Sequence, residues 1–308
     1  MVVQHNITAM NSNRMLGLTT SAQAKSTEKL SSGYKINRAA DDAAGLAISE
    51  KMRRQIRGLT QASANAQDGI SCVQTAEGAL NEVHDMLQRI NELAVKGETA
   101  TLTSTDRSYI QTEVQQLMSE IDRVQSTTTF NEQNLLTGEF TGKALQVGAE
   151  SGQHISITIQ DMSVSGLIAL ATKNQAAKTY GGGEKVSTIK DAASAVMSKF
   201  YNKFDKDAIS TVAVEKDFAS LNAVVKSMLQ EVSKQRSDLG AVQNRLEHTI
   251  SNLDNIVENT TSAESQIRDT DIATEMVKYS NNNILQQAGT SMLSQANQSN
   301  QLALSLLG

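Results

Sequence analysis

A stripe of apolar residues running through residues 52–94 limits what this chain can fold into. Its members are three or four residues apart, which places them on one face of an α-helix. A helix of roughly 45–55 residues would be about 65–80 Å long, far longer than the helices of most globular domains. It cannot bury its stripe against itself, so the chain must supply a partner of similar length. The stripe consists of Met52, Ile56, Leu59, Ala62, Ala66, Ile70, Val73, Ala76, Leu80, Val83, Leu87, Ile90 and Ala94.

A second stripe in the C-terminal half is the expected partner. It begins at Phe218, and its seven-residue step from Val232 to Leu239 passes Gln235. Proline is absent and only 3% of the residues are aromatic, so the chain suits thin seams between helices rather than a thick core. We therefore predict a mostly α-helical, elongated rod in which long helices pair as an antiparallel bundle or coiled coil. The stripe continues through Leu221, Val225, Met228, Val232, Leu239, Val242, Leu246, Ile250, Leu253, Val257 and Ile267.

The two ends of the chain predict more polar helices. Residues 1–32 carry a narrow apolar stripe among Asn, Ser, Thr and Gln, and Gly33 breaks the helix after them. A similar helix follows the segment RDTDIATEM, with Thr270 as its expected N-cap. Helices with such narrow stripes are marginal alone, so we predict that the two ends pair with each other.

The middle of the chain predicts a small mixed region. A helix should begin at Ser104 or Thr105 and end near Thr127, and alternating residues 145–147 and 155–159 predict a β-hairpin. Residues 171–185 have the composition of an exposed loop, and a further helix is expected over 188–204. Gly58, Gly69 and Gly78 lie inside the first long helix, where we expect close packing against a neighbour.

The composition excludes several classes of function. A formal net charge of −5 does not suggest nucleic-acid binding, and no apolar run approaches the roughly 18–20 residues of a membrane span. The N-terminus lacks the pattern of a cleaved signal peptide. Cys72 is the only cysteine, so an internal disulfide is excluded and we expect a packed thiol.

No catalytic or metal-binding pattern is present. The chain has no HExxH and no GxSxG motif, and adjacent Asp41 and Asp42 would point about 100° apart on a helix. We predict that the protein is not an enzyme and holds no cofactor or metal. The four histidines lie on separate segments, at His5, His84, His154 and His248.

Long strings at both ends resemble the bacterial flagellins. The N-terminal strings are LSSGYKINRAADDAAGLAI, GLTQASANAQDGISCVQTAEGALNEV and LQRINELAV. The C-terminal strings are SDLGAVQNRLEHTISNL, RDTDIATEM and ILQQAGTSMLSQANQ, followed by LALSLLG. The resemblance covers roughly residues 1–150 and 215–308 and leaves the middle unmatched. Cys72 departs from the family, whose members usually lack cysteine.

The resemblance implies an extracellular subunit of the flagellar filament that serves motility. Residues 1–42 and 270–308 would form an inner terminal coiled coil, and residues 43–164 and 216–269 a helical rod with the β-hairpin. Residues 165–215 would be a short variable outer segment. Export would use the flagellar type III apparatus without a cleaved signal peptide. Partners would be other copies of the chain, the export chaperone, the filament cap and the hook-associated proteins, with no nucleic acid and no membrane.

The resemblance also gives two sets of candidate residues. Subunit contacts would involve apolar residues of both terminal helices, because neighbouring subunits can cover stripes that one chain leaves narrow. Recognition by host Toll-like receptor 5 would use Arg89 and Leu93, four residues apart, and Glu113 on the following helix. This face could instead be a solvated one with Leu93 partly in the seam, or a face packed between subunits. The polymerisation candidates are Val3, Ile7, Met10, Leu285, Ala288, Met292 and Leu307.

Two other classes are weighed against a flagellin. A hook–filament junction protein, or another secreted helical structural protein, would share long terminal helices. A soluble coiled-coil signalling hairpin would explain the two stripes but neither the β-hairpin nor the terminal strings.

Overall fold

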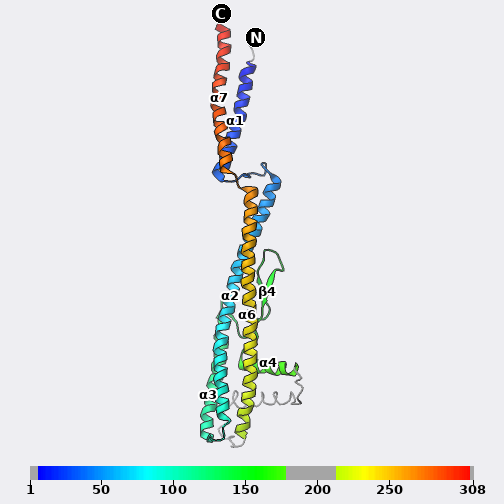
Figure 1. Ribbon diagram of the computed structural model, residues 1–308, viewed down its shortest axis with the longest axis vertical. Helices are drawn as coiled ribbons and strands as arrows, with labels where there is room; N and C mark the ends of the chain where they lie inside the picture. The colour runs from blue at the N-terminus through cyan, green and yellow to red at the C-terminus, as the bar shows by residue number, and fades with distance from the viewer. Residues whose placement is uncertain (1–5, 178–212, 306–308) are drawn as a thin grey trace. The chain divides into compact units, whose positions relative to one another are not determined.

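The computed structural model describes residues 6–177 and 213–305. Its helices are α1 (Ile7–Ser32), α2 (Ala43–Gly97), α3 (Ser104–Thr127), α4 (Val164–Ala177), α6 (Ala213–Arg268) and α7 (Ile272–Ser305) (Figure 1). The strands are β1 (Thr129–Phe130), β2 (Gln133–Asn134), β3 (Lys143–Gln146) and β4 (His154–Ile157), paired as two antiparallel hairpins. The predicted mostly α-helical fold with a small β region is confirmed. The helix expected over 188–204 lies outside the described residues.

The chain divides into two compact units, which are described separately. One unit takes residues up to 58 and from 255 onward, and the other takes residues 59–254. We call them the terminal unit and the central unit. Each of the long helices α2 and α6 has one part in the terminal unit and one part in the central unit.

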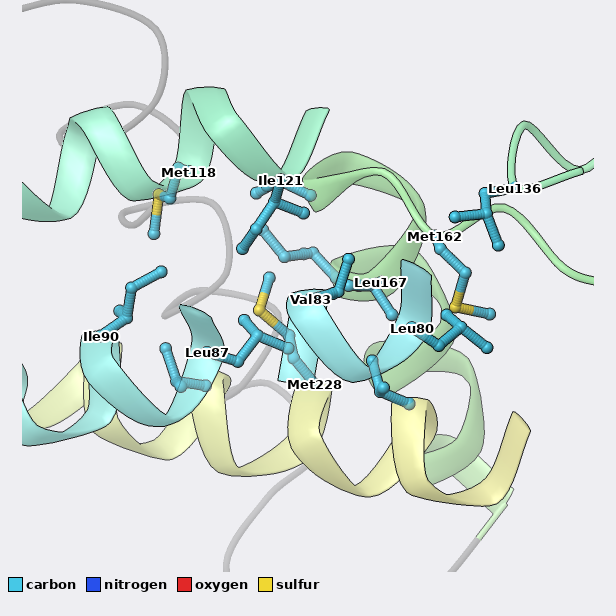
Figure 2. Packing of buried hydrophobic residues seen from close by; sticks show 14 of the residues in the cluster. Leu80, Val83, Leu87, Ile90, Met118, Ile121, Leu136, Met162, Leu167 and Met228 are labelled. Carbon is cyan, nitrogen blue, oxygen red and sulfur yellow. The ribbon is translucent and has the colours of Figure 1, made fainter. Parts of the chain in front are cut away.

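The predicted stripes form the core of the central unit. In Figure 2, Leu80 and Leu87 of α2 and Met228 of α6 lie in the seam between their helices, while Met118 and Ile121 extend toward α2 from α3. Nearly all predicted members of both stripes in this unit are buried, because each stripe faces a second helix along its length. Ile70, Val242 and Ile250 are only half-buried.

The interruption of the second stripe at Gln235 has a structural role. Gln235 is buried, and its Nε2 donates a hydrogen bond to the backbone oxygen of Thr158, 3.0 Å away, just after β4. A buried amide needs such a partner to offset its loss of water. Gln235, the polar residue that interrupts the stripe, therefore links α6 to the segment that follows β4.

Both hairpins pack their apolar side chains inward. The β3–β4 hairpin confirms the predicted one and buries Ile155 and Ile157. The β1–β2 hairpin was not predicted, because its turn uses Asn131 and Glu132 at positive φ (48° and 63°), where the usual signal is a glycine. It leads directly into Leu135, which is fully buried.

The prediction of an exposed loop over residues 171–185 is wrong at its start. Helix α4 continues to Ala177, and its first turns bury Leu167, Ile168 and Ala171. These residues, together with Val164, have helical spacing and pack onto the core, so burial stabilises a segment whose later residues are polar. The Oδ1 atom of Asp122 accepts a hydrogen bond from the Val164 amide at 2.9 Å and so holds the start of α4.

Two glycines of α2 differ in their surroundings and give a matched test. A Cβ on Gly69 would lie 2.3 Å from Cδ2 of Leu145, as expected for close packing, whereas a Cβ on Gly78 would meet nothing within 4 Å, so that expectation is wrong for Gly78. Gly78→Ala should therefore raise the free energy of unfolding by about 1 kcal/mol, through helix propensity alone. Gly69→Ala should give no net gain, because overpacking typically costs about 1–3 kcal/mol. Urea unfolding of both variants checks this, and equal stabilisation would contradict it.

In the terminal unit, α1 and α7 lie side by side (Figure 1). Helix α1 ends as predicted at Gly33, which adopts φ 76°. The cap of α7 was predicted wrongly: the Oδ1 atom of Asp271, not Thr270, accepts from the amides of Ala273 and Thr274. The Thr270 amide instead donates to the Gly33 oxygen at 3.0 Å, which joins the two connecting segments.

Candidate assembly and recognition surfaces

The α1–α7 pair encloses almost no apolar residue. Among the residues of α1 and α7 whose side chains are described, the buried ones are Ser26 and Glu275. Large apolar side chains face outward instead, including Ile7 and Met10. Helix pairs are normally held by apolar burial, so this pair needs additional contacts to be stable.

The predicted polymerisation residues lie on this outward face. Ile7, Met10, Leu285, Ala288 and Met292 are all exposed, whereas Val3 and Leu307 lie outside the described residues. Exposed apolar side chains concentrated on one helix pair are candidates for an interaction surface. The sequence prediction missed further members, although their residue type and spacing could have shown them. We call the whole set the terminal apolar surface: Ile7, Met10, Met15, Leu18, Ile272, Met276, Val277, Ile284, Leu285, Ala288 and Met292.

The structure brings Arg89 and Glu113 together on the surface of the central unit. Nε and Nη2 of Arg89 donate to Oε1 of Glu113 at 3.0 and 2.8 Å, and Nη1 donates to Oε2 of Glu92 at 3.1 Å. These bonds, those to Glu113 above all, raise the pKa of Arg89, so the guanidinium stays charged. All three side chains are largely exposed, and such pairs add little to stability.

Leu93 does not share that surface. It is only 3% exposed and belongs to the main core cluster, so the expectation of an exposed apolar anchor one turn from Arg89 is corrected. The helical spacing is as expected, but Leu93 lies in the core cluster and not on the surface that bears Arg89. Leu93 can stabilise the packing under this surface but cannot contact another protein.

Cys72 is a packed thiol. It is buried among core residues near the β-hairpins, and burial raises its pKa, so the unreactive thiol form is favoured.

The described residues contain no group of side chains arranged to bind a metal ion. None of the described helices has a stretch apolar enough to span a membrane.

Comparisons with known proteins identify relatives of this chain. Residues 3–141 match the family described as the bacterial flagellin N-terminal helical region, and residues 223–307 match the bacterial flagellin C-terminal helical region. A flagellin of Halalkalibacterium halodurans is 47% identical over 307 residues, and a flagellin of Bacillus subtilis is 46% identical over 319 residues, each covering all of both chains. A crystal structure of Bacillus cereus flagellin matches with a TM-score of 0.43 and 19% identity, over 62% of this chain and 88% of that one. With family matches at both ends and relatives of full length, the chain belongs to the bacterial flagellin family.

Proposed function

We propose that this flagellin polymerises through its terminal helices into the flagellar filament and serves motility. The observation that carries the proposal is the α1–α7 pair, which buries no large apolar residue in its described part and presents the terminal apolar surface outward. Neighbouring copies would cover that surface and, by mass action, favour the ordered helices.

The parts of the chain take different roles in this proposal. Residues 1–42 and 270–308 form the inner coiled coil of the filament, and residues 43–164 and 216–269 form the surrounding helical rod. Residues 165–215 contribute a short outer segment. The buried start of α4 adds to the rod, because Leu167 and Ile168 belong to its core.

The subunit would reach the outside of the cell through the flagellar type III apparatus. An export chaperone, the filament cap and the hook-associated proteins would be its partners on that route. None of these partners needs a catalytic site on this chain, in agreement with a structural family.

Electron microscopy of the purified chain tests the proposal. A flagellin should give long helical filaments after seeding or salting-out. Short oligomers would favour a hook–filament junction protein, and dimers would favour a soluble helical hairpin. A variant with Met10→Glu and Met292→Glu should form no filament, because it places charges on the terminal apolar surface.

We propose as a second function that Toll-like receptor 5 recognises the surface around Arg89 and Glu113. The observation that favours it is the convergence of these two residues from α2 and α3 at 2.8 Å. An exposed arginine held by a neighbour offers a planar set of donors at little cost in conformational freedom. Leu93 would act indirectly, by fixing the packing of α3 against α2.

Replacing Arg89 with alanine should weaken receptor binding about thirtyfold, the usual effect of truncating an interface hot spot. Melting of the monomer should hardly change, because the ion pair is exposed. Arg123→Ala is the matched control, since Arg123 forms a comparable exposed pair with Glu120 on α3. Surface plasmon resonance with the receptor ectodomain measures the difference.

The same experiment separates receptor binding from subunit packing. If subunits cover this face, dissociated monomers should bind the receptor well and intact filaments poorly. Wild-type affinity in an Arg89→Ala, Glu113→Ala double variant would contradict the receptor proposal. The surface would then be assigned to subunit packing alone.

A further inference from the structure

A hydrogen bond between two polar side chains lies inside the α1–α7 pair. Ser26 and Glu275 are each only 5% exposed, and the Ser26 hydroxyl donates to Oε1 of Glu275 at 2.7 Å. The Lys278 ammonium donates to the other oxygen, Oε2, at 3.3 Å. A buried carboxylate is costly unless its oxygens are satisfied, so this position tolerates few alternative partners.

Two further contacts show that the helices keep one register along the pair. Nδ2 of Asn6, the N-cap of α1, donates to the backbone oxygen of Ala296 at 3.0 Å. Halfway along, Gly289 faces Leu16 so closely that an added Cβ would lie 3.2 Å from the leucine Cδ1. Between the end contacts α1 advances from residue 6 to residue 26, while α7 descends from 296 to 275, so the helices run antiparallel and in step.

Apart from these three contacts and the backbone hydrogen bond from Thr270 to Gly33 at the end of α1, the seam of the pair consists of small and half-buried residues. Seams of small and half-buried residues can slide by a turn with little change in apolar contact, and a single buried polar contact is a well-attested way to prevent this. A slip of four residues would place Ala22 or Leu30 opposite Glu275. Neither side chain can donate a hydrogen bond to the carboxylate.

We propose that Glu275, bonded to Ser26, sets the register of α1 against α7 and thereby aligns the terminal apolar surface for assembly. In this register Met10 lies level with Met292, and Leu18 lies near the level of Leu285. A slip would separate these residues and break up the surface that a neighbouring copy covers. The inference rests on the proposed polymerisation and adds the residue that specifies its geometry.

The charge state of Glu275 agrees with this role. The hydrogen bond from Ser26, followed by the contact with Lys278 and the nearby Lys29, lowers the pKa of Glu275 against the opposing effect of burial. The side chain is therefore a carboxylate near neutral pH, the form that the buried position requires to accept both hydrogen bonds.

Disulfide trapping in assembled filaments tests the register directly. In a Cys72→Ala background, Leu16→Cys with Gly289→Cys reports the observed register, since a Cβ on Gly289 would lie 4.0 Å from that of Leu16, within disulfide range. Leu16→Cys with Leu293→Cys reports a slip of about one turn. With Glu275 present, the first pair should close at least about tenfold faster than the second, which lacks the required geometry. Intramolecular and intermolecular bonds are separated on non-reducing gels.

Glu275→Leu is the decisive variant. Leucine removes the buried charge at similar volume, a change that is often neutral or stabilising when a polar group has no specific role. We expect it to reduce the ratio of the two disulfide closure rates to about twofold. We also expect it to raise the critical concentration for polymerisation at least about tenfold. Glu275→Gln still accepts a hydrogen bond from Ser26, so it should keep most of the difference between the two closure rates.

Each outcome decides the matter. If Glu275→Leu retains the tenfold ratio of closure rates, other contacts set the register and the inference is wrong. If that variant does not assemble alone, the trapping is done with it as a minor component in filaments of the parent, where the same comparison holds. A wild-type chain that forms no filament would instead contradict the proposed function.

Discussion

Replacing Leu80 with alanine should lower the free energy of unfolding of the central unit by about 2–5 kcal/mol. Leu80 is fully buried in the seam of α2, among core residues that include Met162 and Met228 (Figure 2). The truncation would lose transfer free energy and leave a cavity, since the backbones of two long helices cannot collapse around one missing side chain. Denaturant unfolding followed by circular dichroism measures the loss.

Two valines of α2 give a control with identical chemistry. Val83 is 0% exposed and Val95 is 50% exposed, so Val83→Ala should be clearly destabilising and Val95→Ala nearly neutral. Equal midpoints for the two valine variants would show that the assigned stripe is not the packed face.

Helix periodicity predicted the central unit well, because there it coincides with burial. A stripe that faces a second helix along its whole length must be apolar at every third or fourth position, and Leu59 through Ala94 follow that rule. The bounds of α3 were also predicted closely, from a start at Ser104 or Thr105 to an end near Thr127, and in the structure Thr103 and Asp106 form a capping box at its start.

Other features depend on contacts that a pattern does not contain. Leu93 has the spacing of a surface neighbour of Arg89, but it is buried in the core that several helices form together. The turn at Asn131 and Glu132 has positive φ at both residues without a glycine, so the local sequence does not signal it. Glu275 reads as one more polar residue of a polar helix, and only its pairing with Ser26 reveals that it is buried.

Deleting residues 270–308 should abolish polymerisation and leave a soluble, helical monomer. The deletion removes α7 and, with it, the contacts through which Asn6, Leu16 and Ser26 hold α1 in place. The core of the central unit is untouched, because its buried residues all come from residues 59–254. The helical signal should therefore fall by the contribution of α7 and α1 and no further. Circular dichroism, sedimentation and electron microscopy measure these properties on one preparation.

Leu80→Ala is the converse control, and the pair of results separates folding from assembly. At a temperature where Leu80→Ala is still folded, it should polymerise as the parent does, because the terminal apolar surface is intact. The deletion variant should show the parent's denaturation midpoint for the central unit and form no filament at any concentration. Unfolding of α2 and α6 by the deletion would mean that the terminal helices stabilise the central unit as well. The separation of an inner assembly domain from a self-sufficient helical rod would then be wrong.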